Sequence, residues 1–361
     1  MVYILRRELE QLCTGIFFAA GIPREEAEDS AKILITADAR GIRSHGVARI
    51  KRYVDGIKAG LIKGGVAPTV LRETPLSLVL DAEGGMGLSL SRKSMEKVID
   101  MARAHGMGVC SIRNSNHFGI AGFYSEMAAR RDMIGITMTN TAALGVPTFA
   151  REAMFGTNPI AFAVPGLGKD LFSLDMATTT VTRGKVEVAA QEGKPIPPGW
   201  AVGTDGLVTD NPARLLEDML YQRGGGLLPL GGEGITLGGY KGYGLAVMVD
   251  ILCALSSGGV FGKAVMDSAI TSARVCHFFL ALRIDLFRDP MEFKKDISRM
   301  LGELTALKPA EGANRVYYAG LHEQEAEALC ETQGVPLTPE VWKILTETAV
   351  DLGVPVPVPL S

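Results

Sequence analysis

Apolar residues recur every three or four positions in residues 5–16, and this spacing predicts an amphipathic helix. A second helix is expected to begin near Pro23 and to end at Gly41, because proline favours the first helical turn and glycine favours helix ends. A third helical stretch, residues 45–58, carries polar groups at i, i+4 spacing that a core helix does not need. The chain is therefore expected to begin with helices only.

From residue 76 onward the pattern changes to short strand-like runs that alternate with helices. The strand-like runs are LSLVLD at 76–81, GVCSI at 108–112, IGITMTN at 134–140, PIAFAVP at 159–165, LFSLDMA at 171–177, VCHFFLAL at 275–282 and RVYYAG at 315–320. Helical periodicity is found in residues 89–105, 120–131, 245–255, 291–307, 323–333 and 338–349. The predicted fold class is α/β (mixed α+β), with residues 76–319 as the body and residues 1–75 plus 320–361 as a helical domain built from both ends.

Length and charge exclude several classes of protein. A chain of 361 residues fits two packed domains or one large domain with a substantial core. The net charge of −3 provides no basic surface, so nucleic acid is not expected as a partner. The N-terminus alternates charged and apolar residues and lacks the features of a signal peptide, so we expect a cytosolic protein. The longest apolar stretch, residues 243–261, is interrupted by Asp250 and by the SSGG run at 256–259, which favours a buried helix over a membrane span.

Cysteine and histidine spacing gives no indication of a disulfide framework or a metal site. The cysteines are scattered, odd in number and never spaced CxxC; they are Cys13, Cys110, Cys253, Cys276 and Cys330. The five histidines include no pair spaced for a metal on one helix. The chain also lacks GxGxxG, GxxxxGK[ST], GxSxG and HExxH, which argues against a Rossmann fingerprint, a P-loop, a hydrolase elbow and a zincin.

The first candidate group for chemistry is the segment RSHGVARIKRY at residues 43–53. If this segment is helical from Ser44, then His45, Arg49 and Tyr53 lie one turn apart on a single face. A guanidinium can hold a carboxylate through two parallel hydrogen bonds, and an imidazole can exchange a proton near neutral pH. This set suits a small hydroxy or keto acid. The alternative is a solvated cationic helix face capped by Ser44.

The second candidate group is NSNHFGIAGFYS at residues 114–125, where a strand ends and a helix begins. α/β proteins often place ligands at such a junction, because the strand end is open and the helix N-terminus carries partial positive charge. His117 could act there as a general base. The alternative is a structural histidine that is hydrogen-bonded to a loop carbonyl.

The third candidate group combines hydroxyls with cations. Threonines at 178–180 and 182 are followed by Arg183 and Lys185, which together supply donors and charge for a phosphate. Lys241 stands between glycines in GGYKGYG, beside backbone that a ligand can approach closely. These features favour a pyrophosphate site. The alternatives are an ordinary strand-rich segment with a capped helix start, and a tight turn at the glycines.

Six ordered blocks resemble the type-2 malate/L-lactate dehydrogenase family of NAD(P)-dependent oxidoreductases, whose relatives include sulfolactate, ureidoglycolate and diketogulonate dehydrogenases and a reductase of cyclic imines. The blocks are RSHG with the following Arg49 and Tyr53, NSNHFG, GTNPIAFAVPG, LDMATTTVTRGK, GGYKGYGLAVMVDIL and CHFFLAL. The resemblance covers nearly the whole chain. It implies a non-Rossmann NAD(P)-binding mixed sheet and a homodimer with sites near the subunit interface.

The resemblance also implies roles for individual residues. His117 and His45 are expected at the reacting carbon, with His117 as the base and His45 as a supporting donor. Ser44, Arg49 and Tyr53 are expected to bind the substrate, with Arg49 and Tyr53 near its carboxylate. The implied shell for NAD or NADP consists of Asn140, Asn158, Asp175, Met176, Ala177, Thr178, Thr180, Arg183, Lys185, Tyr240 and Lys241.

The reaction implied by the resemblance is hydride transfer between nicotinamide and a small 2-hydroxy or 2-oxo acid. The preferred pair is L-malate and oxaloacetate, or L-lactate and pyruvate. Two other hypotheses remain open, namely a cyclic imine reductase of the same family and a non-catalytic dinucleotide-binding protein. No metal is expected. The chain departs from the family pattern at Ala319-Gly320-Leu321, where relatives have Pro-Gly-Glu and a cofactor contact.

Overall fold

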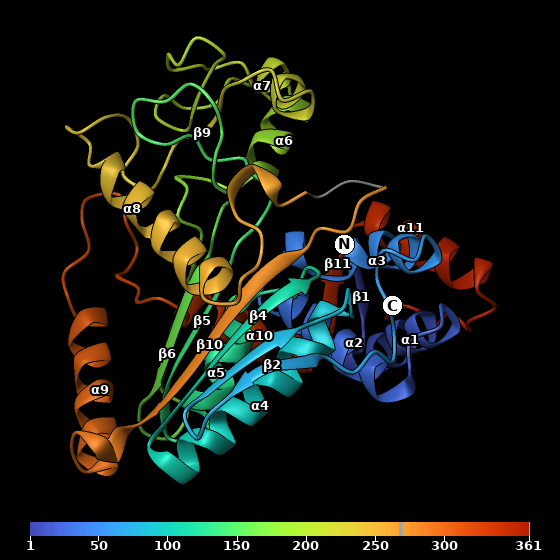
Figure 1. Cartoon of the computed structure of the whole chain (residues 1–361), viewed down its shortest axis with the longest axis vertical. Coiled ribbons are helices and arrows are strands. Elements are labelled where there is room, and N and C mark those ends of the chain that lie inside the picture. Colours follow the sequence, from blue (N-terminus) through green and yellow to red (C-terminus); the bar gives the residue numbers. More distant parts are fainter. Residues whose placement is uncertain (267–269, 361) are drawn as a thin grey trace.

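A computed structural model describes residues 1–266 and 270–360, and its centre is a mixed sheet of seven strands (Figure 1). The order of the strands is β2-β3-β4-β10-β5-β6-β7, in which β3 and β4 are parallel and all other neighbours are antiparallel. The strands of this sheet are β2 (Thr69–Glu73), β3 (Ser77–Asp81), β4 (Met107–Ser115), β5 (Met133–Thr139), β6 (Ile160–Pro165), β7 (Leu171–Met176) and β10 (Val275–Arg283).

Helices cover both faces of the middle of the sheet. On one face α4 packs against β4 and β10, and α5 packs against β5 and β6. On the other face α8 continues into a π-helical turn, Ile251–Leu255, that packs against β4 and β10. The helices are α1 (Arg6–Ala19), α2 (Arg24–Ala39), α3 (Ile50–Lys58), α4 (Gly87–His105), α5 (Ala121–Ala129), α6 (Arg183–Gln191), α7 (Pro212–Leu220), α8 (Gly239–Asp250), α9 (Pro290–Thr305), α10 (Leu321–Gln333) and α11 (Pro339–Asp351).

The central strands are apolar on both sides because both sides are covered. Along β10, Phe279 and Ala281 join the core under α4 and α5, whereas Cys276 and Phe278 join the core under α8. This alternation follows from the two-residue period of a strand. A strand that is covered on both faces is therefore recognised by a continuous apolar run such as VCHFFLAL rather than by alternation.

The two ends of the chain lie together (Figure 1). Strand β1 (Val2–Ile4) pairs with β11 (Val335–Leu337) in a two-stranded antiparallel sheet, and α1 packs against both α2 and α11. A second small sheet, β8 (Ala201–Val202) with β9 (Gly226–Leu227), lies in the upper lobe with α6 and α7. The predicted α/β class and mixed sheet are confirmed. The domain division at residues 75/76 and 319/320 stays a prediction.

Two predicted elements differ from the structure. Residues 315–320 are not a strand, because only one backbone hydrogen bond, from the Ser173 N–H to the Ala319 carbonyl, joins this segment to β7 before α10 begins. The third predicted helix does not run from residue 45. Two 3-10 turns, Arg43–His45 and Val47–Arg49, precede α3, and the extended backbone of Gly46 separates them.

The long apolar stretch forms a helix that is buried on one side only. Ala246, Val249 and Cys253 pack into the core, whereas Ile251 and Leu255 are 46% and 55% exposed. The prediction of a buried helix at residues 245–255 is therefore correct for one face of α8 and its π-helical turn, and wrong for the other. Among the described residues, no helix combines the length and the apolar character needed to cross a membrane.

Candidate active site

The first part of the site is the pair of 3-10 turns that follows α2. The Asp38 carboxylate, at the end of α2, accepts a hydrogen bond of 2.7 Å from the Val47 N–H. A Cβ atom at Gly46 would collide with this carboxylate, so only glycine fits there. Burial raises the pKa of Asp38 to about 7. Asp38 thereby holds the short segment that carries Ser44, His45 and Arg49.

The second part is the junction between β4 and α5. The Asn116 side chain donates to the carbonyls of Gly84 and Gly85 at 2.9 and 3.0 Å, which fixes the end of β4. Gly119 adopts a φ of 83°, a conformation that favours glycine and turns the chain into α5. His117 lies between these two anchors and is held by them.

The two parts meet at His117. Its ring stacks on that of His45, with centroids 5.5 Å apart, and its Nδ1 lies 2.6 Å from the Tyr53 hydroxyl. Burial, and next the charge of Arg49, lower the pKa of His45 to about 4. Burial, Arg49 and His45 lower the pKa of His117 well below its ordinary value. Both imidazoles are therefore neutral at physiological pH.

His117 and Arg49 line one cavity of about 590 Å³. Among its described lining residues the cations are Arg49, Lys51, Arg52 and Arg183 and the one carboxylate is Asp55; Lys51 is paired with Asp55, and Arg183 with Glu187 outside the lining. Other lining residues are Tyr53, Asn116, Thr141, Ser272, Val275 and Ile344. The cavity is thus strongly cationic, and an anionic ligand would be favoured in it.

Arg49 has hydrogen-bonding capacity to spare. Within the described part of the chain, its one hydrogen bond runs from Nε to the Ser44 carbonyl at 2.6 Å. The two terminal nitrogens are left for a ligand, and this planar pair matches the two oxygens of a carboxylate. The hydroxyl of Ser272 is shielded from solvent and lacks a hydrogen-bond partner among the described residues. Both groups are suited to a polar ligand in this cavity.

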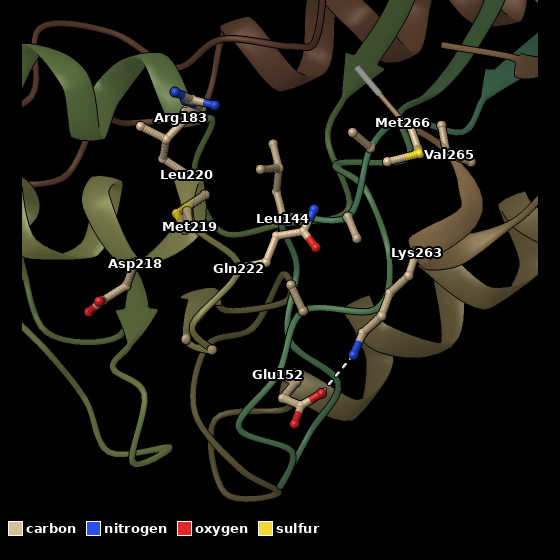
Figure 2. Close-up of a pocket in the computed structure, with 15 residues that line it drawn as sticks. Leu144, Glu152, Arg183, Asp218, Met219, Leu220, Gln222, Lys263, Val265 and Met266 are labelled. Carbon is tan, nitrogen blue, oxygen red and sulfur yellow. Dashed lines mark hydrogen bonds and ion pairs between the residues drawn. The ribbon is translucent and has the colours of Figure 1, made fainter. Parts of the chain in front are cut away.

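A second cavity, of about 440 Å³, is shown in Figure 2. It shares Ala142 and Arg183 with the first cavity. Met219, Leu220 and Gln222 at the end of α7 form one wall. An ion pair of 2.6 Å between Lys263 and Glu152 closes the opposite side. The second cavity is therefore a smaller neighbour of the cationic cavity, lined by both apolar and polar groups.

A smaller pocket of about 210 Å³ lies where the β4–α5 junction enters α5, since Ile120 and Gly122 line it, and its charge is opposite. Three carboxylates, those of Glu126, Asp175 and Glu323, line it together with one cation, Arg40. The remaining lining residues are Ile42, Ile120, Gly122, Ser173, Leu174, Tyr318, Ala319, Gly320 and His322. We refer to it below as the acidic pocket.

The charged groups of the acidic pocket differ in how many of their hydrogen-bonding atoms are already bonded within the protein. Arg40 donates to both oxygens of Glu126, at 2.8 and 2.7 Å, and to Glu327 at 2.8 Å, so its guanidinium is fully paired. Asp175 accepts from the Gly122 N–H at 2.7 Å through one oxygen. Asp175 is accessible through the pocket yet densely surrounded by protein, and this burial raises its pKa to about 6. Its second carboxylate oxygen remains available to a ligand.

The structure brings most of the predicted catalytic and substrate residues together, but by another route than one helical face. His45, Arg49 and Tyr53 come from three successive short elements, and the prediction of one helix from Ser44 is wrong. Ser44 makes no helix-capping hydrogen bond; its Oγ lies 2.9 Å from His45 Nδ1. The roles themselves stay predictions.

Four predicted cofactor residues have polar atoms that bind within the protein. Asn140 donates to Asp250 at 2.9 Å and accepts from the Cys276 N–H at 2.7 Å. Asn158, Thr178 and Thr180 bond to backbone groups of neighbouring loops. These four side chains position the surrounding loops. Any contact they make with a cofactor would use hydrogen-bonding atoms or lone pairs that these bonds leave free.

The remaining predicted cofactor residues are spread over three places. Asp175 lies in the acidic pocket, and Met176 and Ala177 follow it at the end of β7. Arg183 borders both larger cavities. Lys185 lies 5.9 Å from the Trp200 ring, and Lys241 lies 5.8 Å from the Tyr240 ring at the start of α8; Lys185, Tyr240 and Lys241 line none of these three cavities.

Sequence reasoning missed several residues of the site. Arg52 belongs to the RSHGVARIKRY segment but was assigned no role, although a second cation in a predicted anion site is a usable signal. The acidic pocket gave no such signal, because Arg40, Glu126 and Glu323 are far apart in sequence and join only in the fold. Within the described ranges, no cluster of three or more His, Cys, Asp or Glu residues could hold a metal ion.

Comparison with known proteins places these features in context. The family model for malate/L-lactate dehydrogenase matches residues 4–346. The chain is 43% identical over 356 residues to malate dehydrogenase from Pyrococcus abyssi, covering 98% of this chain and 96% of that protein. Other relatives are named as NAD(+)- and NADP(+)-dependent dehydrogenases.

Solved structures give the same result. The crystal structure of malate dehydrogenase from Entamoeba histolytica matches with a TM-score of 0.94 and 32% identity, covering 99% of both chains. Delta1-piperideine-2-carboxylate reductase from Pseudomonas syringae pvar. tomato matches with a TM-score of 0.83 and 28% identity, covering 97% of this chain and all of the other.

Proposed function

Because the chain belongs to the malate/L-lactate dehydrogenase family, we propose that it transfers a hydride between NAD or NADP and a small 2-hydroxy or 2-oxo acid. The observation that carries this proposal is that Arg49 and His117, from distant parts of the sequence, line one cationic cavity. A carboxylate-binding group and a proton-exchanging group are the two things that the protein must supply for this reaction.

Arg49 is the residue we assign to the carboxylate. Its terminal nitrogens are free of other described residues, and Nε is fixed by the Ser44 carbonyl. The guanidinium is thus held in place before the substrate arrives, which reduces the entropy lost on binding. An acid bound there would be oriented with its 2-oxo or 2-hydroxy carbon toward the neighbouring cavity wall that contains His117.

His117 is the residue we assign to the proton, with His45 as a supporting group. A neutral imidazole can accept the hydroxyl proton when a 2-hydroxy acid is oxidised, and it returns the proton when the oxo acid is reduced. The neighbouring Arg49 and Arg52 stabilise the negative charge that develops on the substrate oxygen. Such a proton-transfer group typically contributes about 10²–10⁴ in rate.

The residues around the β4–α5 junction fit a dinucleotide. The Gly122 N–H in the first turn of α5 holds one oxygen of Asp175, and the free oxygen of Asp175 can accept from a ribose hydroxyl. We therefore propose that the cofactor extends from the cationic cavity to the acidic pocket, with Arg183 on the side of the reacting ring. When bound, NAD or NADP supplies the ring carbon that takes or gives the hydride.

We propose that this enzyme prefers NAD to NADP. Three carboxylates line the acidic pocket, and its one arginine is already paired with two of the chain's glutamates. An uncharged ribose diol suits such a lining, whereas a 2′-phosphate would meet like charges without a free cation. Measured kcat/KM ratios for the two cofactors test this preference.

L-Malate and oxaloacetate are the preferred substrate pair. One carboxylate uses Arg49, and two further arginines on the same cavity wall, Arg52 and Arg183, add positive charge near it, although the Arg183 Nε is already paired with Glu187 at 2.8 Å. L-Lactate and pyruvate, which carry a single carboxylate, would leave that surplus of positive charge unmatched. The similarity to malate dehydrogenase supports the same order of preference.

A cyclic imine reductase is the second candidate, favoured by the structural likeness to delta1-piperideine-2-carboxylate reductase. A cyclic imine acid also carries one carboxylate for Arg49. The third candidate is a non-catalytic dinucleotide-binding protein, which would bind NADH and consume none.

The deciding experiment follows NADH and NADPH absorbance with oxaloacetate, pyruvate and Δ1-piperideine-2-carboxylate in turn. We expect the fastest consumption with NADH and oxaloacetate. If NADH or NADPH is consumed only with the imine, the cyclic imine reductase replaces the proposed substrate class. If the protein binds NADH tightly but consumes none with any substrate, the non-catalytic protein is favoured.

We further propose a cytosolic homodimer with its sites near the subunit interface. The exposed apolar face at Ile251 and Leu255 supports an interface along α8, because such a face is costly to leave in water. Light scattering should give a dimer for the wild type and a monomer for Leu255→Asp. A monomeric wild type would contradict the proposal.

A further inference from the structure

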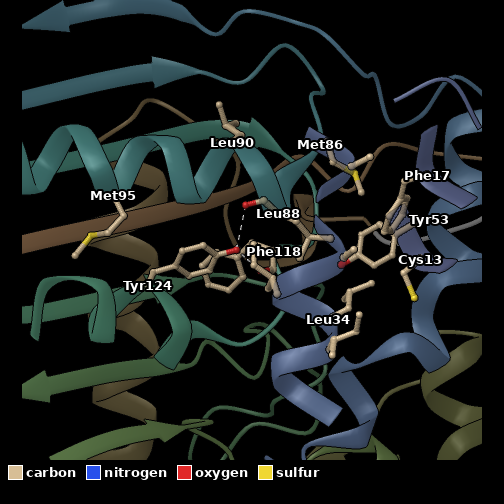
Figure 3. Packing of buried hydrophobic residues seen from close by; sticks show 14 of the residues in the cluster. Cys13, Phe17, Leu34, Tyr53, Met86, Leu88, Leu90, Met95, Phe118 and Tyr124 are labelled. Carbon is tan, nitrogen blue, oxygen red and sulfur yellow. Dashed lines mark hydrogen bonds between the residues drawn. The ribbon is translucent and has the colours of Figure 1, made fainter. Parts of the chain in front are cut away.

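Tyr53 is fixed in the core (Figure 3), and its hydroxyl lies within hydrogen-bond distance of His117. The residue is 3% exposed, and its ring meets that of Phe17 edge to face with centroids 6.0 Å apart. Figure 3 shows the Tyr53 ring among Phe17, Cys13 and Leu34, at the end of the cluster nearest α1. Packing therefore sets the position of the hydroxyl independently of any ligand.

Three contacts determine the state of the His117 ring. Tyr53 Oη lies 2.6 Å from Nδ1 and 3.4 Å from the His117 carbonyl oxygen, and the Gly119 N–H points to Nδ1 at 3.3 Å. An N–H group can only donate, whereas a hydroxyl can donate or accept. Gly119 alone would therefore restrict Nδ1 to an acceptor and would leave the ring hydrogen on Nε2.

Tyr53, unlike Gly119, can form a hydrogen bond with Nδ1 in either form of the ring. When Nδ1 is bare, the hydroxyl donates to it. When Nδ1 carries a hydrogen, Oη accepts that hydrogen and its own O–H turns to the His117 carbonyl. Burial raises the pKa of Tyr53, so the hydroxyl keeps its hydrogen throughout.

The charges around His117 make this acceptor important. Arg49, Arg52, His45 and His277 act on the ring from the 43–49 turns, α3 and β10, and each is cationic or neutral. A proton taken up by His117 is therefore disfavoured by its surroundings. A hydrogen-bond acceptor at Nδ1 offsets part of that cost, since the charged ring has two N–H groups to satisfy.

We propose that Tyr53 is a positioning residue that gives His117 access to the form with a bare Nε2, so that Nε2 can exchange the proton of the reaction. The inference rests on the proposed function and replaces the expected role of Tyr53 at the substrate carboxylate. In the oxidation direction a hydride leaves the carbinol carbon for the nicotinamide ring, the hydroxyl proton moves to Nε2, and the carbon–oxygen bond becomes a carbonyl. The imidazolium then releases its proton to water, and reduction reverses each step.

The variant that tests this inference is Tyr53→Phe, which keeps the ring and removes the hydroxyl. We expect kcat to fall about 10- to 100-fold, the range found when the partner that orients a metal-bound histidine is removed. The KM for oxaloacetate should change less than about twofold, because Arg49 still binds the carboxylate. For malate oxidation, in which His117 must be uncharged to accept the proton, the acid limb of the kcat/KM profile should move to lower pH, since the charged ring has lost its acceptor.

A second readout needs neither cofactor nor substrate. In protein labelled with ¹⁵N-histidine, the His117 signals should show both neutral tautomers in the wild type and only the Nε2–H tautomer in Tyr53→Phe. The His117 signals are assigned by their absence in His117→Gln. Identical tautomer populations in wild type and variant would overturn the inference.

Phe17→Leu is the matched control, because it loosens the packing of the Tyr53 ring and keeps the hydroxyl. It should lower Tm while retaining the mixture of tautomers and a turnover within about twofold of the wild type. A raised KM with unchanged kcat in Tyr53→Phe would return Tyr53 to the carboxylate and overturn the proposal. Lack of any activity in the wild type would refute the proposed function instead, and the tautomer measurement would still test Tyr53.

Discussion

The cationic cavity and the acidic pocket lie along one strand-to-helix junction, with His117 in the first and Gly122 in the second, and their charges are opposite. Arg49, Arg52 and Arg183 line the cavity, whereas three carboxylates line the pocket. Both are built partly from the end of α2 and the residues just after it, since Asp38 holds the turns of the cavity and Arg40 lies in the pocket. The same stretch of backbone thus supports an anion site and a site for a neutral polar group.

This difference explains how one small region can treat two ligands differently. A free guanidinium attracts a carboxylate, but Arg40 is paired with Glu126 and Glu327 and offers no such attraction. The number of arginines is therefore less informative than whether their nitrogens are already engaged. The predictions below alter one of the two sites at a time.

The largest effect is expected from His117→Ala in the cationic cavity. Turnover should fall by about 10²–10⁴, because the proton-transfer group is lost. The dissociation constant for NADH, measured by fluorescence, should stay within about threefold of the wild type. Unchanged turnover would reject the assignment of His117.

Arg49→Lys tests the carboxylate site. An ammonium lacks the planar pair of donors, so KM for oxaloacetate should rise about 10- to 100-fold, in line with about 1.5–3 kcal/mol for a charged hydrogen bond. Arg43→Lys is the matched control, because Arg43 is exposed in the same segment. Equal KM values in the two variants would argue against Arg49 as the clamp.

Asp175→Asn tests the acidic pocket. Removal of one negative charge should raise the kcat/KM for NADPH relative to NADH by about tenfold, which corresponds to about 1.4 kcal/mol. Asp205→Asn is a suitable control, since Asp205 also accepts one backbone N–H, at 3.0 Å, but in an exposed turn. An unchanged kcat/KM ratio for NADPH against NADH in Asp175→Asn would show that the ribose binds elsewhere.

The smallest effect concerns the stretch that joins the two sites. The pKa of Asp38 is raised to about 7 in the folded protein, above its ordinary value of 3.8, so stability from this group is full below about pH 4 and is lost as pH rises toward 7. Asp38→Asn removes this dependence and keeps an oxygen for the Val47 N–H. The gain in Tm over the wild type should therefore grow between pH 4 and pH 7; a constant difference would contradict the assignment.

Much of the fold could be predicted from local pattern. The runs that became β3, β4, β5, β6, β7 and β10 were recognised because continuous apolar residues mark strands that are covered on both faces. RVYYAG at 315–320 has the same composition but lacks a neighbouring strand edge to pair with along its length. Strand composition alone does not supply a partner.

Family motifs predicted which residues belong to the site. They did not predict the orientation of those residues, because tertiary contacts determine it. His45, Arg49 and Tyr53 do meet at His117, but they reach it through turns that require glycine at position 46. Any Cβ atom there would collide with Asp38. The Tyr53 hydroxyl meets His117 across 64 positions of sequence, from α3 to the β4–α5 junction. Such orientations follow from the assembled core and cannot be deduced from the spacing of residues.

A crystal structure of the protein with NADH and oxamate, an unreactive analogue of pyruvate, tests the central claim most directly. We expect the oxamate carboxylate on the terminal nitrogens of Arg49, its carbonyl oxygen within hydrogen-bond distance of His117, and the adenosine ribose on Asp175. Oxamate bound away from Arg49 and His117, or the adenosine ribose bound in the cationic cavity, would contradict the claim.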